Sequence, residues 1–175
     1  FGRSFSHLQS VVSNKGIIFA NGLSDAGIVP IGKHFPGHGS ALSDSHKGFT
    51  DITNTYKQYE LVPFEKACNA GLEAIMVGHV FNQKVDEKYP ATLSKKHIDI
   101  LKSIGCEHAL VISDDMDMGA ITQNFGRENA LILAINAGVD VLVLSNNIST
   151  YNPESYFEAR KIIYDAVQAD RKSVV

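Results

Sequence analysis

One glycine-rich stretch of the chain holds several side chains that could carry out acid–base chemistry. Between Gly32 and Lys47 lie one lysine, three histidines and one aspartate, namely Lys33, His34, His38, Asp44 and His46. A loop that only joins a strand to a helix needs about 2–6 residues, so this stretch is far longer than a connection requires. Long loops with titratable side chains often carry function, which makes this stretch the first candidate site.

The spacing of Asp44 and His46 suits a proton-transfer pair. Residues two apart on an extended segment point in the same direction. The carboxylate could therefore accept the Nδ1 proton of the imidazole and leave Nε2 facing a substrate. An ordinary imidazole pKa of about 6.5 already suits acid–base catalysis near neutral pH, and a neighbouring carboxylate raises it. A solvated loop histidine is the alternative.

A second cluster of acidic residues lies later in the chain. Asp114 and Asp115 come shortly after the apolar run 109–112, and Asp117 follows two positions further on. Paired carboxylates after a buried strand can hold a metal ion, act as nucleophile and base, or simply cap the next element. Three acids within four residues repel one another unless a positive group is near, which favours a functional site over a simple cap.

Lys33 and His34 end an apolar run, where an unpaired charge is unfavourable. Each is therefore expected to have a partner or a polar ligand. His34 and His38 are four residues apart, but the Pro36-Gly37 pair between them rules out the helical zinc-binding pair. The sequence also lacks a Gly-Lys-Ser/Thr phosphate loop, a Gly-x-Gly-x-x-Gly dinucleotide turn and a Gly-x-Ser-x-Gly nucleophile elbow.

Strand and helix patterns alternate along the chain. Apolar runs predict strands at residues 28–33, 74–78, 109–112 and 139–144, and helical spacing predicts helices at about 6–26, 55–69, 94–105, 127–136 and 153–169. The strands show no polar alternation, so they are expected to be buried on both faces of a parallel sheet built from βα units. The core-facing residues expected in the first helix are Leu8, Val11, Val12, Ile18, Phe19 and Leu23.

A polar or ionisable group follows each predicted strand. In chain order these groups are Lys33-His34, His79, Asp114-Asp115 and Ser145-Asn146. The carboxyl ends of parallel strands meet at the edge where α/β proteins bind ligands, so the four groups predict one site. A complete (β/α)8 barrel takes about 250 residues, and four units in 175 residues indicate roughly half of one. An open four-stranded sheet is the alternative.

The composition is that of one globular domain spanning residues 1–175, with 44% hydrophobic and 20% charged residues. The net charge of -3 argues against a nucleic-acid or anionic-membrane surface. No apolar run approaches the roughly 18 residues of a membrane span. Cys68 and Cys106 form no metal or redox motif, so buried free thiols are expected.

The histidine-rich stretch resembles the signature of the family 3 glycoside hydrolases, specifically their β-N-acetylglucosaminidase branch. The signature is the run Lys-His-Phe-Pro-Gly-His-Gly at 33–39, followed by Asp44-Ser45-His46. Matching segments continue at residues 2–5, 60–64, 74–79, 90–94 and 111–116. The resemblance covers essentially the whole chain. It implies a (β/α)8 TIM-barrel catalytic domain, of which this chain is expected to be roughly the second, C-terminal half, with the N-terminal strands absent.

The resemblance also implies a retaining glycosidase that releases terminal β-linked N-acetylglucosamine, notably from muropeptides in peptidoglycan recycling. Asp114 resembles the nucleophile, which would form a covalent glycosyl intermediate. His46 resembles the general acid/base, and Asp44 resembles the residue that orients it.

Further roles follow from the same resemblance. Arg3, Lys33 and His34 resemble residues that hold the sugar hydroxyls. Asp115 is expected to support the site, and His38 matches the motif without an assigned role. The resemblance implies no metal and no cofactor.

The expected absence of the first strands has consequences for assembly. A half barrel would expose apolar sheet edge, so self-association or completion by a missing N-terminal half is expected, with weak or no hydrolysis by this chain alone. A cytoplasmic location is expected. Two alternatives stay open: an inactive half barrel that only binds sugar, and a metal-dependent hydrolase using His34, His38, His46, Asp114 and Asp115.

Overall fold

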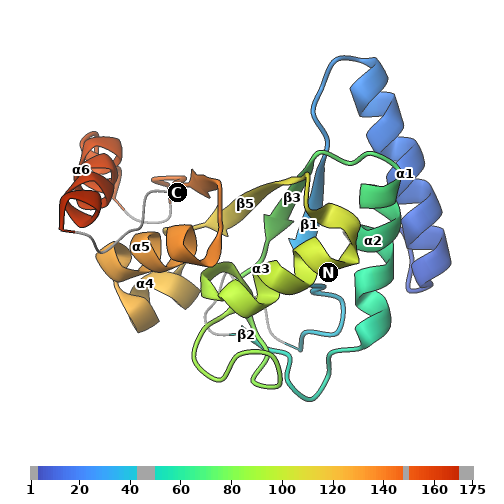
Figure 1. The fold of residues 1–175 in the computed structure, drawn as a ribbon, viewed down its shortest axis with the longest axis horizontal. Helices are drawn as coiled ribbons and strands as arrows, with labels where there is room; N and C mark the ends of the chain where they lie inside the picture. Colours follow the sequence, from blue (N-terminus) through green and yellow to red (C-terminus); the bar gives the residue numbers. More distant parts are fainter. Residues whose placement is uncertain (1–3, 43–49, 148–149, 170–175) are drawn as a thin grey trace.

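A four-stranded parallel sheet forms the centre of the protein (Figure 1). The computed structural model describes residues 4–42, 50–147 and 150–169. The sheet contains, in spatial order, β1 (Ile31–Phe35), β3 (Ala74–Val77), β5 (Leu110–Asp115) and β6 (Val141–Val143). Each neighbouring pair is parallel, so the four predicted strands and their parallel arrangement are confirmed. The first strand begins and ends later than predicted, at residues 31–35 and not 28–33.

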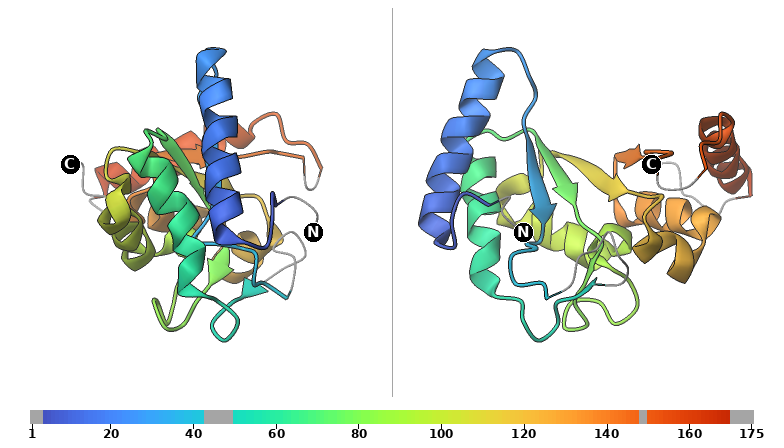
Figure 2. Two further views of the ribbon diagram at one scale, coloured as in Figure 1. Left: turned by 90° about the vertical axis from the view of Figure 1, so that its right-hand side faces the viewer. Right: turned by 180° about the vertical axis from the view of Figure 1, so that it is seen from behind.

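Helices connect the strands. They are α1 (Gln9–Asp25), η2 (Gln58–Leu61), α2 (Val62–Asn69), η3 (Ala91–Leu93), α3 (Lys95–Leu101), η4 (Lys102–Cys106), α4 (Gly119–Phe125), α5 (Arg127–Ala137) and α6 (Ser155–Gln168). The segments η2 and η3 are 3-10 turns, and η4 is a π-helical turn. The helices α1 and α2 lie side by side at one end of the sheet, and α6 stands at the other end (Figure 1, Figure 2).

Three helix boundaries follow the signals in the sequence. Ser94 caps α3, because its hydroxyl accepts a hydrogen bond from the His97 N–H at 3.3 Å. Pro63 lies in the first turn of α2, where its missing N–H breaks no helical bond. Gly105 has a φ of +94°, a left-handed conformation that ends the helical segment after α3.

Three short elements were not predicted. The strands β2 (Thr50–Asp51) and β4 (Val80–Phe81) form a separate parallel pair, and α4 precedes the expected helix at 127–136. Two residues are too few to show strand alternation. The seven residues of α4 carry too few apolar positions to show a helical stripe.

The prediction that all four strands are buried on both faces is wrong for three of them. In β3 every residue is buried or half-buried, because β1 and β5 flank it. The first residues of the other strands are exposed by 44% at Ile31, 51% at Leu110 and 42% at Val141. The described residues therefore leave apolar surface on the sheet uncovered.

The expected core face of α1 is right for Val11, Val12 and Leu23, which are half-buried. It is wrong for Leu8, Ile18 and Phe19, which are exposed. The covered stripe also includes Ser13, Gly16, Ile17 and Ala20. These positions recur at helical spacing, and α1 packs against α2. Within the described part of the chain, no helix combines the length and apolar character needed to cross a bilayer.

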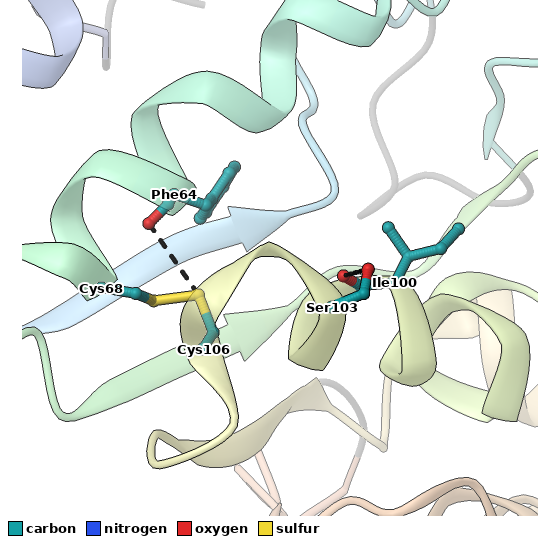
Figure 3. Close-up of a disulfide and its surroundings, with 5 residues drawn as sticks. All are labelled: Phe64, Cys68, Ile100, Ser103 and Cys106. Atoms are coloured by element: carbon teal, nitrogen blue, oxygen red, sulfur yellow. Dashed lines mark hydrogen bonds between the residues drawn. A yellow bond between two sulfur atoms is a disulfide. The ribbon is translucent and has the colours of Figure 1, made fainter.

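Cys68 and Cys106 form a disulfide, which corrects the expectation of free thiols (Figure 3). The helix α2 packs against η4 and brings the two Cα atoms to 5.3 Å, although the cysteines are 38 residues apart. Both are buried. The Cys106 Sγ atom lies 3.9 Å from the Phe64 carbonyl oxygen. This is a packing contact, because a disulfide sulfur carries no proton to donate.

Candidate active site

The carboxyl ends of the parallel strands meet at one edge of the sheet, and polar side chains from these ends contact one another. His34 at the end of β1 meets Asp114 at the end of β5. His79 and Ser145, which follow β3 and β6, both bond to Asp115. The structure thus brings together the strand-end groups from which the sequence predicted one site.

His34 and Asp114 face each other across the end of the sheet. The Nε2 atom of His34 lies 3.7 Å from Asp114 Oδ2, and their side chains are 14% and 13% exposed. Both residues lie where strand pairing is irregular, at register shifts between residues 33 and 35 of β1 and between 112 and 115 of β5. Such irregularities re-aim side chains and are common beside active sites.

Gly78 makes room for this contact. The strand β3 lies between β1 and β5, so His34 must pass over its end to reach Asp114. A Cβ atom added to Gly78 would lie 3.1 Å from the Cβ of His34, which is closer than ordinary packing allows. A glycine after β3 therefore lets the imidazole approach the carboxylate.

Asp115 serves as an anchor between β5, β6 and the following turn. Its Oδ1 atom accepts hydrogen bonds from the backbone N–H groups of Ser145 at 3.0 Å and Asp117 at 3.1 Å. Its Oδ2 atom accepts one from the Ser145 hydroxyl. Three donors hold this carboxylate in place, so of the two neighbouring acids Asp114 is better placed to face a ligand.

Backbone N–H groups compensate the cluster of three acids. Asp114 Oδ1 accepts from the N–H of Asp115 at 2.9 Å, and Asp117 Oδ2 accepts from the N–H of Asn146 at 2.9 Å. Bonds of this kind to a carboxylate are charge-assisted and stronger than neutral ones. The sequence predicted that a positive group must lie near these three acids. Backbone N–H donors largely take that role, and the His34 ring lies beside Asp114.

Sequence reasoning assigned no role to His79, although it noted its place after β3. Its side chain is 2% exposed, its Nδ1 atom lies 2.9 Å from Thr92 Oγ1, and its Nε2 atom lies 2.9 Å from the Asp115 carbonyl oxygen. The signal that could have found it is a histidine following a fully apolar strand. A buried imidazole needs polar partners, but the sequence alone does not show which ones.

The start of the long loop after β1 is fixed by η2 and the segment before it. The Ser40 hydroxyl donates to Glu60, and the Tyr56 hydroxyl donates to the Pro36 carbonyl at 3.1 Å. Burial, and secondarily the Glu60 carboxylate, raise the pKa of Tyr56 well above its usual value, so Tyr56 stays a neutral donor. The His38 ring meets the His34 ring edge-on, with 6.0 Å between centroids.

The remaining predicted site residues are placed differently. The Lys33 side chain is exposed and its ammonium makes no hydrogen bond or ion pair within the described ranges. Of the two expectations for Lys33, a protein partner is not found within the described ranges, and a polar ligand stays a prediction. Arg3, Asp44 and His46 lie outside the described residues, and their roles stay predictions.

The alternative of a metal site gains no support from the geometry. Among the described residues no group of three or more His, Cys, Asp or Glu side chains is arranged to hold a metal ion. Of the five residues that this alternative requires, His46 lies outside the described ranges.

A family model matches almost the entire chain. It is the "Glycosyl hydrolase family 3 N terminal domain" and it covers residues 1–171. This is the TIM-barrel-like domain of the family, which agrees with the parallel α/β fold. The match places the chain in the N-terminal part of such proteins, which corrects the expectation of a C-terminal half.

Curated relatives and solved structures agree with this match. The chain is 34% identical to beta-hexosaminidase LpqI of Mycobacterium tuberculosis over 79% of its own length and 38% of that protein. It is 35% identical to a beta-hexosaminidase of Tolumonas auensis over 83% and 45% of the respective lengths. The chain thus spans about two fifths of these relatives.

A solved structure of a family 3 β-N-acetylglucosaminidase from Paenibacillus sp. str. FPU-7 superposes with a TM-score of 0.86 at 31% identity. The superposition covers 98% of this chain and 32% of that one.

Proposed function

Because the chain belongs to glycoside hydrolase family 3, we propose that the protein is a retaining β-N-acetylglucosaminidase that removes terminal β-linked N-acetylglucosamine. The observation that carries this proposal is the position of Asp114. Its carboxylate faces His34 at the edge where parallel α/β folds bind ligands, while the neighbouring Asp115 is engaged as an anchor.

Asp114 is the nucleophile in this proposal. Its Oδ2 oxygen attacks the anomeric carbon, the glycosidic C–O bond breaks, and the leaving oxygen takes a proton from His46. The sugar is then held as an ester of Asp114. Neutral His46 next removes a proton from water, which attacks the anomeric carbon and releases the carboxylate.

The other proposed roles concern binding and orientation. Asp44 accepts the second ring proton of His46 and fixes its tautomer. His34, Lys33 and Arg3 hold sugar hydroxyl groups. The exposed ammonium of Lys33 supports this assignment, since a donor without a protein partner is available to a ligand.

The proposed substrates are N-acetylglucosamine-containing saccharides, in particular muropeptides released during peptidoglycan recycling. Support comes from relatives named beta-hexosaminidase and from the β-N-acetylglucosaminidase structure. No second function is favoured by a particular contact in the structure.

The protein is also proposed to need further protein surface to complete its barrel. Within the described residues β1 and β6 each pair with one strand only. Apolar side chains before and at the start of β1 are exposed, namely Ile28, Val29 and Ile31. Unpaired, apolar strand edges favour association, so either additional strands of the same polypeptide or a second copy covers them. Sedimentation of the isolated chain tests this, and a monomer with normal turnover contradicts it.

The test of function is hydrolysis of 4-nitrophenyl N-acetyl-β-glucosaminide by this chain and by the full natural polypeptide. The proposal expects release of nitrophenol by the full polypeptide, loss of release in Asp114→Asn, and full activity after treatment with a chelator. Sugar binding without turnover in the full polypeptide would indicate the inactive binding module, and loss of activity on chelation would indicate the metal-dependent hydrolase.

A further inference from the structure

His79 connects the ends of two neighbouring strands but takes no part in the steps above. It lies two residues after the end of β3, and its Nε2 atom reaches the Asp115 carbonyl oxygen of β5 at 2.9 Å. On its other side, Nδ1 lies 2.9 Å from Thr92 Oγ1, whose residue is fully buried. The ring therefore bridges β3, β5 and the turn η3 that contains Thr92.

The direction of the His79–Asp115 bond follows from its partners. A carbonyl oxygen only accepts, so the proton lies on Nε2. The Thr92 hydroxyl has a single proton, and the atoms that could accept it are Nδ1 and the carbonyl oxygens of Val77 at 3.1 Å and Gly78 at 2.9 Å. Whichever atom accepts it, His79 remains a donor toward Asp115.

This bond lies just beyond the point where regular pairing between β3 and β5 stops. The last pair between β3 and β5 is Val77 with Ser113. The pairing of β5 with β6 shifts after Ile112 and resumes at Asp115, which pairs with Val143. Neither ladder gives Asp114 a partner among the described residues. The position of the Asp114 backbone therefore depends on how its neighbour Asp115 is held.

Asp115 is held from three directions. Its carboxylate binds Ser145 beside β6, and its carbonyl oxygen accepts from the Met118 N–H at 3.1 Å in the following turn. From the β3 side, the His79 ring donates a hydrogen bond to the same Asp115 carbonyl oxygen. Loss of that bond would let the end of β5, and Asp114 with it, move relative to His34.

We propose that His79 is a positioning residue for the reaction, which fixes the nucleophile Asp114 by donating an Nε2 hydrogen bond to the Asp115 carbonyl. This inference rests on the proposed role of Asp114. It predicts that removal of the donor lowers kcat, since misplacement of a reacting group by about 1 Å can cost about 100-fold in rate. The Michaelis constant is unaffected, because His79 is buried and holds no sugar hydroxyl.

The test compares variants of the full natural polypeptide. His79→Leu removes the donor and keeps an apolar side chain, whereas His79→Gln offers an amide N–H near the Nε2 position without a titratable ring. His97→Leu is the matched control, because it removes another buried imidazole of the same chain that is not part of the site. Steady-state kinetics with an aryl N-acetylglucosaminide and thermal unfolding are measured for each.

We expect kcat to fall about 10- to 100-fold in His79→Leu, with KM unchanged. In His79→Gln, kcat should recover to within a few-fold of the wild-type value. In His97→Leu, kcat should stay normal. Normal kcat in His79→Leu, or equal losses in both His79 variants, would overturn it.

Two further variants separate folding and the proposed function from this inference. If His79→Leu does not fold, Thr92→Val provides the test, since loss of the hydroxyl that orients the ring should lower kcat several-fold and unchanged kcat overturns the inference. Covalent labelling that persists in Asp114→Asn would instead overturn the proposed function itself.

Discussion

The Nε2 atom of His34 lies 3.7 Å from Asp114 Oδ2, although β3 separates the strands that carry them. The contact depends on the missing side chain at Gly78, whose added Cβ would press on His34. It also depends on the irregular pairing of β1 and β5 at both residues. The proposed sugar-binding residue His34 and the proposed nucleophile Asp114 thus meet although their strands are not adjacent.

Gly78→Ala tests this relationship. The new methyl group would lie 3.1 Å from the His34 Cβ, so the imidazole must shift by a few tenths of an ångström. We expect KM to rise about ten-fold, the effect of weakening one hydrogen bond to the sugar, with a smaller change in kcat. Gly22→Ala is the control, because nothing lies within 4 Å of its added Cβ and alanine favours the helix. An unchanged KM in Gly78→Ala would show that His34 does not need this space.

The buried, neutral imidazole of His97 should make the protein less stable in mild acid. Its side chain is 1% exposed, and neither ring nitrogen has a hydrogen-bond partner among the described residues. Burial lowers the pKa of His97 to about 4, against a smaller opposing effect of Asp86. The unfolded chain therefore binds this proton at a higher pH than the folded one. The free energy of unfolding should fall by up to about 3 kcal/mol as pH decreases from about 6.5 to about 4.

Urea unfolding at pH 7, 6.5, 5.5, 4 and 3 measures this loss, and His97→Leu should remove most of the part above pH 4. A decline that continues below pH 4 in the variant is expected from Asp86. Burial alone would raise the pKa of Asp86, but hydrogen bonds from Ser94 and from backbone N–H groups lower it, so its contribution is lost only as pH falls through that lowered value. An identical decline between pH 6.5 and 4 in both proteins would contradict the role of His97.

The Cys68–Cys106 disulfide predicts a redox-dependent stability. Closing a loop of 38 residues removes chain entropy worth about 4 kcal/mol from the unfolded state. Reduction should therefore lower the urea midpoint of the wild type, and the reductant should have no effect on the Cys68→Ala/Cys106→Ala variant. Alkylation of both thiols in the unfolded, unreduced protein would contradict the disulfide.

The disulfide also bears on location. Structural disulfides persist in oxidising compartments and are rare in the cytosol of mesophiles. The bond between Cys68 and Cys106 weighs against the cytoplasmic location expected from the sequence. That location stays a prediction.

His46→Ala tests the proposed acid/base. General acid–base catalysis contributes about 10²- to 10⁴-fold, and good leaving groups need little protonation. We expect a loss in this range on disaccharides and a much smaller loss in the first step on nitrophenyl glycosides. Equal losses on both substrates would argue against proton donation by His46. Asp44→Asn should show the same ranking with smaller losses, since its proposed role is only to orient the His46 ring.

The sheet and the composition of its polar edge could be predicted because both depend on local sequence. Apolar runs marked β1, β3, β5 and β6, and the residues immediately after them carry the polar groups. The cap at Ser94 and the helix stop at Gly105 are likewise local, since each is fixed by the chemistry of one residue.

Features that depend on tertiary contacts could not be predicted. The pairing of Cys68 with Cys106 requires α2 to pack on η4, and the covered stripe of α1 is decided by α2. The different roles of Asp114 and Asp115 depend on Ser145, which is 30 residues away in sequence. Both acids could be predicted at the strand end from the sequence. Which of the two carboxylates is hydrogen-bonded to neighbouring residues could not.

The most direct measurement is to trap the glycosyl intermediate with a fluorinated sugar inactivator and to locate the label by peptide mass spectrometry. The account predicts a single ester on Asp114, absent in Asp114→Asn and still formed in Asp115→Asn at a reduced rate. A label on Asp115, or turnover with no covalent intermediate, would contradict it.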